Sequence, residues 1–143
     1  MDKRFWVCGL VMSIAALLLG FIVHGVLLAP DYAALGAMFR SDADSRQYAH
    51  WMVLAHVLVG FAMTWLYAQG FSGSRSALFQ GLRFGLAMAL FSTVPGYLIY
   101  YAVQPLPASL VAKQLLAGVA TMLLLGLLVA WLQPRRKVLA ELP

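Results

Sequence analysis

Four long apolar stretches, none of which contains an acidic residue, occupy most of this 143-residue chain. An α-helix needs roughly 20 apolar residues to cross a hydrocarbon core about 30 Å thick. Each stretch reaches that length, and the five acidic residues all lie in the connections or the tails. The sequence therefore predicts an all-α membrane protein with a single transmembrane domain over residues 1–143. The four predicted spans are residues 5–29, 47–69, 77–101 and 108–133.

The composition separates this chain from ordinary soluble domains. Hydrophobic residues make up 63% of it, whereas soluble domains are about half apolar. The formal net charge is +5, which in a soluble protein would suggest nucleic-acid binding. Here the basic residues gather at the ends of the apolar stretches, which is typical of topology signals. We therefore expect the protein to contact the lipid bilayer and no nucleic acid.

One side of the predicted membrane domain collects most of the basic residues. They lie before the first span, in or near the connection between the second and third spans, and after the fourth: Lys3, Arg4, Arg75, Arg83, Arg135, Arg136 and Lys137. An excess of Lys and Arg in short loops marks the cytoplasmic side of a membrane protein. Because short connections make consecutive helices antiparallel neighbours, we expect an antiparallel four-helix transmembrane bundle with both termini in the cytoplasm.

The connection between the first two spans carries the signals of a short helix of its own. Pro30 ends the first span, and Asp31 is suited to cap a new helix. Side chains suited to an interfacial helix then fall on one side of it: Tyr32, Leu35, Met38 and Phe39. Farther on, Asp44 with Gln47 three residues later resembles a capping box that opens the second span.

Small residues at helical spacing form a stripe along each span, and the third span shows it clearly. We expect this span to pack through Gly81, Gly85, Ala89 and Gly96. Small residues let helix backbones approach closely in lipid, and the GxxxG spacing suits either packing within the chain or a dimer seam. Pro95 removes a backbone hydrogen bond, so it predicts a kink that is either a fixed bend or a hinge.

Two histidines lie on such stripes in different spans. His24 and His56 are both predicted in the outer half of the bundle, where they could face each other. Two facing imidazoles could bind the iron of haem b or another metal, or could hold a quinone. The alternative is that each neutral imidazole bonds a neighbouring hydroxyl or carbonyl group, because no second histidine pair and no carboxylate accompanies them.

Lys113 is a charged residue inside a predicted span. It lies about one turn from the outer end of the fourth span, and no acidic residue is in register with it on any predicted helix. A lysine at this depth can extend its apolar stem until the ammonium group reaches the lipid headgroups. We therefore expect Lys113 to extend toward the outer membrane surface, and Arg83 to extend toward the inner one.

The sequence contains no motif of a known catalytic site. No HExxH, P-loop or GxGxxG motif occurs, and no Asp or Glu lies within a span to relay protons. The leading hypothesis is a non-enzymatic accessory or structural subunit that packs against other membrane helices, either in a homo-oligomer or in a larger membrane complex. Two alternatives are a small redox protein with His24 and His56 as ligands, and a small-molecule carrier that uses the kink at Pro95 as a hinge.

Three segments support a resemblance to a known family. They are residues 23–35 (VHGVLLAPDYAAL), 81–85 (GLRFG) and 94–105 (VPGYLIYYAVQP). With these segments the chain resembles a family of small four-span proteobacterial inner-membrane proteins, a domain family without an assigned function. The resemblance covers most of the chain and implies a location in the bacterial inner membrane. It implies no activity, cofactor or site residue.

Overall fold

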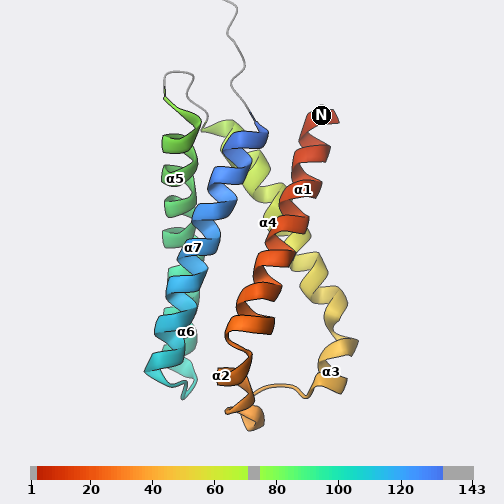
Figure 1. Ribbon diagram of the computed structural model, residues 1–143, viewed down its shortest axis with the longest axis vertical. Helices are drawn as coiled ribbons and strands as arrows, with labels where there is room; N and C mark the ends of the chain where they lie inside the picture. Colours follow the sequence, from red (N-terminus) through yellow and green to blue (C-terminus); the bar gives the residue numbers. More distant parts are fainter. Residues whose placement is uncertain (1–2, 71–74, 134–143) are drawn as a thin grey trace, which may run out of the picture.

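The computed structural model describes residues 3–70 and 75–133, and within these residues the secondary structure is helical without any strand. Seven α-helices, two π-helical segments and one 3₁₀ turn follow one another in this part of the chain (Figure 1). They are α1 (Lys3–Gly20), a π-helical segment (Phe21–Leu27), α2 (Ala29–Ala33), the 3₁₀ turn (Gly36–Met38), α3 (Asp42–Gln47), α4 (Ala49–Gln69), α5 (Ala77–Met88), a second π-helical segment (Ala89–Thr93), α6 (Val94–Val103) and α7 (Ala108–Leu132).

Four helical stretches of the described chain are long and apolar enough to cross a membrane, which confirms the prediction of an all-α protein with four candidate spans. The first stretch is α1 together with the π-helical segment after it, and the third joins α5, the second π-helical segment and α6. Their bounds are Lys3–Leu27, Ala49–Gln69, Ala77–Val103 and Ala108–Leu132, each within two residues of the predicted ends.

The third span changes its helical form just before Pro95. Proline has no backbone N–H, and its ring collides with the carbonyl group four residues earlier, so a regular α-helix does not continue through it unchanged. In the structure α5 ends at Met88, the π-helical segment Ala89–Thr93 follows, and Pro95 lies in the first turn of α6. A proline is well tolerated in a first helical turn, because the N–H groups there have no partner within the helix.

The long helices pack as two pairs. The most extensive contacts join α1 to α4 and α5 to α7. The two pairs meet mainly through α7, which also contacts α1 and, to a smaller extent, α4. In Figure 1 α7 lies between α5 and α1, whereas the end of α4 nearest to α3 diverges from α1. The packing of α4 on α1 is therefore concentrated away from α3.

Glycine residues permit the closest approaches between paired helices. A Cβ atom added at Gly85 would lie only 2.5 Å from the carbonyl oxygen of Met122 in α7. A Cβ atom added at Gly60 would collide with the backbone and hydroxyl group of Ser13 in α1. Backbones can come this close in a membrane protein only where the side chain is absent or very small.

Buried apolar side chains form two clusters. The larger cluster combines residues of α1, α4 and α7: Cys8, Met12, Ala16, Met63, Tyr67, Leu125, Val129 and Ala130. The smaller one lies at the end of the molecule that carries α2, and contains Val23, Leu28, Leu106, Leu110 and Val111. Many other large apolar side chains are exposed on the helix surfaces, as expected of helices whose surroundings are as apolar as their own side chains.

The connection between the first two spans differs in detail from the sequence prediction. The expected helix after Asp31 is divided into α2 and the 3₁₀ turn, and no side chain caps α2. The predicted capping box at Asp44 is wrong. Ser41 instead caps α3 by accepting the Asp44 N–H at 3.3 Å, and α4 begins only at Ala49. The side-chain cap thus lies one short helix earlier than expected, because α3 separates it from the span.

Candidate functional site

Polar side chains from three spans and from α2 meet at the α2 end of the molecule. We call this group, which consists of His24, Tyr32, Tyr97 and Gln114, the histidine–tyrosine cluster. The Tyr32 hydroxyl lies 2.7 Å from His24 Nδ1 and accepts a hydrogen bond from Gln114 Nε2 at 3.0 Å. His24 Nε2 lies 3.3 Å from the Tyr97 hydroxyl. The His24 imidazole therefore links the first span to α2 and to the third span, and Tyr32 extends the connection to the fourth span.

One member of the cluster lies in an irregular helical segment, and another lies shortly after one. His24 lies in the π-helical segment Phe21–Leu27, and single π-helical turns are frequent at functional sites. Tyr97 follows two residues after Pro95 in α6. A Cβ atom added at Gly118 would lie 3.2 Å from the Tyr97 ring, so the glycine lets this ring approach α7 closely.

The hydrogen bonds of the cluster have a consistent set of proton positions. Because the Tyr32 oxygen accepts the Gln114 amide proton, its own proton can be donated to His24 Nδ1. The neutral tautomer with its proton on Nε2 then donates to the Tyr97 hydroxyl. Gln114 Oε1 is buried and has no hydrogen-bond partner among the described residues. Gln114 Oε1 is thus an unused acceptor beside a continuous chain of hydrogen bonds that runs from Gln114 through Tyr32 and His24 to Tyr97.

An ion pair borders the cluster and corrects the expectation for Lys113. Lys113 Nζ lies 2.7 and 3.0 Å from the two carboxylate oxygens of Asp31 in α2. The sequence predicted no acidic partner, because Asp31 belongs to the connection and is not in register on a span. Tyr32 follows Asp31 in the chain, Gln114 follows Lys113, and the side chains of Tyr32 and Gln114 also form a hydrogen bond with each other. Two adjacent polar contacts therefore join α2 to α7.

Tyr32 has an environment that keeps its hydroxyl protonated. Burial, the largest cause, raises the pKa of this hydroxyl; the hydrogen bond from Gln114 lowers the pKa, and the Asp31 carboxylate raises it. The net direction is upward from the ordinary tyrosine value. Tyr32 is therefore a hydrogen-bond donor throughout the neutral pH range.

The second predicted histidine lies outside the cluster. His56 Nδ1 is 2.7 Å from the backbone oxygen of Met52 in α4, and Nε2 lies 2.7 Å from the position that a Cβ atom at Gly20 would take. No hydrogen bond joins His56 to His24 within the described chain, and residues 3–70 and 75–133 contain no group of three or more His, Cys, Asp or Glu placed to hold a metal ion. A haem b or quinone site on His24 and His56 stays a prediction, which an absorption spectrum of the purified protein would test.

The small residues singled out on the third span lie in different settings. Gly81 and Gly85 pack against Gly126, so this contact joins α5 to α7 within one chain. Ala89 is fully buried in the π-helical segment. A Cβ atom added at Gly96 would meet no atom within 4 Å. The stripe therefore contributes close contacts in α5, and its last member faces open space.

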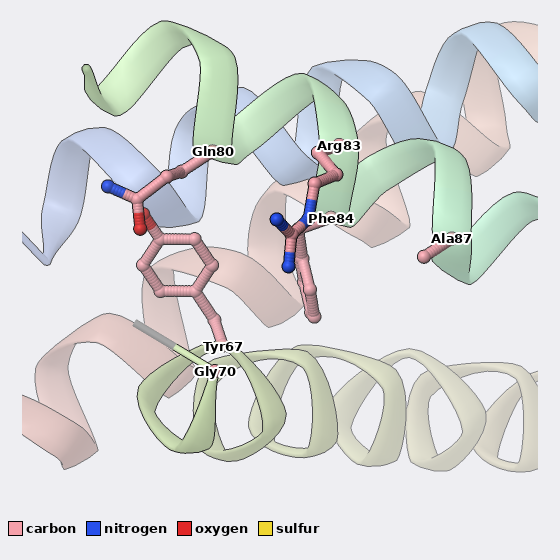
Figure 2. Close-up of a pocket in the computed structure, with 6 residues that line it drawn as sticks. All are labelled: Tyr67, Gly70, Gln80, Arg83, Phe84 and Ala87. Carbon is pink, nitrogen blue, oxygen red and sulfur yellow. The ribbon is translucent and has the colours of Figure 1, made fainter. Parts of the chain in front are cut away.

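A cavity of about 150 Å³ lies between α4 and α5, at the end of the molecule opposite to α2. Gln80 is buried and donates from Nε2 to the Arg75 carbonyl oxygen at 2.9 Å, while the Tyr67 and Phe84 rings pack edge to face. One feature of the sequence points to this site, a single arginine in an apolar span. The lining residues, shown in Figure 2, are Tyr67, Gly70, Gln80, Arg83, Phe84 and Ala87.

No family model matches the chain, and no curated protein and no solved structure matches it. Three features of the chain itself bear on its function: the histidine–tyrosine cluster at one end, the cavity at the other, and the uneven packing of the four spans.

Proposed function

We propose that the protein is a non-enzymatic integral membrane protein that packs against further membrane helices as an accessory or structural subunit. The partner helices would belong either to copies of the same chain or to a larger membrane complex. The observation that carries this proposal is the exposure of the first two turns of α4, residues 49–55, on all of their faces.

The first two turns of α4 are exposed in the described part of the chain. Every residue from 49 to 55 is exposed, so the exposed surface covers the whole circumference rather than one stripe. The large side chains on it are Trp51, Met52, Val53 and Leu54. The buried residues of α4, which are Gly60, Met63, Thr64 and Tyr67, all lie in its second half. About a third of this span, seven of its 21 residues, is thus available for contact with another helix.

Two further observations support a subunit role. Of an 18-residue apolar stretch in the third span only 6% is buried, against 33% in the first span, so much of the surface of the third span is also exposed. The exposed first two turns of α4 contain Ala55 and are followed by the half-buried His56. Small and hydrogen-bonding residues are typical of contacts between membrane helices, because lipid offers them no hydrogen bond.

A photo-crosslinking residue at Leu54 tests the proposal directly. Leu54 is 45% exposed on α4, and the matched control position, Leu124 on α7, is 51% exposed. On irradiation in the native membrane we expect the Leu54 variant to form a discrete protein adduct and the Leu124 variant to form none. Gentle solubilisation and mass measurement would then identify the adduct as a second copy or as a different protein. A monomeric particle without an adduct at Leu54 would contradict the subunit role.

We also propose that the four spans form an antiparallel bundle in a bacterial inner membrane, with both termini in the cytoplasm. The basic residues near the ends of the first and third spans support this orientation: Lys3, Arg4, Arg75 and Arg83. The start of α1 and the end of α4 lie at one end of the molecule in Figure 1, and α2 and α3 lie at the other. Reporters that work only in the periplasm, fused after residue 142 and within residues 42–45, should be silent and active respectively. The reverse pattern would invert the proposed topology.

A further inference from the structure

We infer that the cavity between α4 and α5 binds an anionic phosphate group, with the guanidinium group of Arg83 as its cationic partner. A phospholipid headgroup and a soluble phosphate both present this chemistry. The inference concerns a site within one chain, so it does not depend on whether α4 binds a partner helix.

The charge of the residues that line the cavity suits an anionic ligand. Arg83 is the only charged residue among the six that line the cavity, and no acidic side chain is among them. Within the described residues Arg83 forms no ion pair, whereas Lys113 and Arg40 are paired with carboxylates. An arginine matches the geometry of a phosphate group through two parallel N–H donors. The cavity therefore offers net positive charge and directional donors.

The walls of the cavity combine groups that suit a phosphate and groups that suit an acyl chain. In Figure 2 Arg83 extends from α5 toward α4, and the Tyr67 ring extends from α4 toward α5, so the two side chains border the space from opposite walls. The hydrogen bond from Gln80 to the Arg75 carbonyl oxygen holds the end wall in place. Phe84 and Ala87 continue the lining with apolar groups. A lining that combines polar and apolar groups suits a phosphate that is attached to an acyl chain.

The position of Arg83 along the third span is close to the expected membrane surface. The third span has 27 residues and is about 40 Å long, against a hydrocarbon core of about 30 Å. If the excess is shared, about 5 Å at each end lies in the headgroup region. Arg83 is six residues, or about 9 Å, from the start of the span, and its long side chain can reach back toward the surface. The Arg83 backbone then lies about 4 Å inside the hydrocarbon core, a depth from which its side chain can reach the headgroup region.

The experiment uses the purified full-length chain in a neutral detergent. Native mass spectrometry with increasing phosphatidylglycerol should show one tightly held lipid per chain. Replacing Arg83→Gln should weaken this binding about tenfold or more, since a charge-assisted hydrogen bond of at least about 1.4 kcal/mol is lost. Arg83→Lys keeps the charge without the two parallel donors and should be intermediate. Lys3→Gln removes one charge at the same end, outside the cavity, and should bind as the wild type does.

A calorimetric titration of the detergent-solubilised chain with inorganic phosphate separates the two sources. Saturable phosphate binding that Arg83→Gln removes would assign the site to a soluble anion, whereas binding of phosphatidylglycerol alone would assign it to a lipid. Helicity and particle size are measured for each variant, and Arg83→Lys carries the test if Arg83→Gln does not stay monodisperse. Unchanged lipid and phosphate binding in the Arg83 variants, or an equal loss in Lys3→Gln, would overturn the inference.

Discussion

The two ends of the molecule are held together by different kinds of contact. Toward the N-terminal end, α5 and α7 approach until the backbones of Gly85 and Gly126 touch. At the α2 end, His24, Tyr32 and Gln114 join the helices through hydrogen bonds, and an ion pair lies beside them. Lipid is as apolar as the helix surfaces, so apolar side chains alone do not drive helices together. The comparison shows two ways of replacing that missing driving force within one small protein.

The two kinds of contact should respond differently to substitution. A close backbone contact has no space for an added atom, because the neighbouring group is itself backbone and cannot rotate away. A polar contact near the protein surface loses only the hydrogen bond, and the freed groups can find other partners. We therefore expect large effects at the glycine contacts and smaller ones at the α2 end.

Gly85→Ala should give the largest effect. The new Cβ atom would lie 2.5 Å from the Met122 carbonyl oxygen and 2.8 Å from the Leu123 Cα atom, so α5 and α7 must separate. We expect a loss of about 2–3 kcal/mol in the free energy of unfolding, typical of overpacking. The measurement is unfolding in mixed micelles with increasing denaturing detergent.

Gly96→Ala is the matched control for that substitution. It makes the same chemical change in the same span, but the new Cβ atom meets nothing within 4 Å. Alanine also favours a helix over glycine by up to about 1 kcal/mol, so the free energy of unfolding should be unchanged or slightly higher. Equal destabilisation by the two substitutions would show that the α5–α7 approach is not the stabilising contact.

The glycine contact was partly predictable from sequence. The spacing of Gly81 and Gly85 is a local signal, and both residues lie where the backbone of α7 comes close to the third span. The same spacing is also compatible with a dimer seam, because it does not identify the helix that packs against these glycines. Their partner, Gly126, lies more than 40 positions later in the chain, and only the folded arrangement identifies it.

Tyr32→Phe should have an intermediate effect. It removes the hydroxyl that contacts both His24 Nδ1 and Gln114 Nε2, so two contacts are lost at once. Hydrogen bonds between membrane helices average about 0.6 kcal/mol, and we expect a loss of about 1 kcal/mol in the free energy of unfolding. Tyr100→Phe, at a residue that is 55% exposed, serves as the control. If the Tyr32→Phe protein is as stable as the control, the hydrogen bonds of Tyr32 do not contribute to the free energy of unfolding.

The histidine–tyrosine cluster was less predictable than the glycine contact. His24 could be selected from sequence because an imidazole inside an apolar span is unusual. Tyr32 was expected on the apolar side of a loop helix, and its hydroxyl instead bonds a residue 82 positions away. Hydropathy and periodicity report which helix face is buried, not which distant group it meets. For the same reason the sequence did not reveal Asp31 as the partner of Lys113.

The ion pair at the α2 end should contribute less than the hydroxyl of Tyr32. The side chains of Lys113 and Asp31 are 54% and 25% exposed, so Asp31→Asn should cost about 0.5 kcal/mol. The cost should shrink as the salt concentration rises, because salt screens exposed charges. Exchanging the charges, with Asp31→Lys and Lys113→Asp together, should restore part of the loss. Additive losses in the double variant would show that the two side chains do not interact.

The smallest predicted effect is the pH dependence that Tyr32 contributes. Burial raises the pKa of its hydroxyl in the folded state, so the folded protein holds this proton more tightly than the unfolded chain. The contribution of this group to stability is complete below about pH 10, the ordinary value, and falls as the pH rises through the raised value. The tyrosinate absorbance of the wild type minus that of Tyr32→Phe isolates this titration. Its midpoint should lie above that of the same difference measured in denaturant, and an equal or lower midpoint would mean that Tyr32 is as solvated as a free tyrosine. In that case the hydrogen bonds of Tyr32 would contribute less at the α2 end, and the contrast with the glycine contact would be larger than we propose.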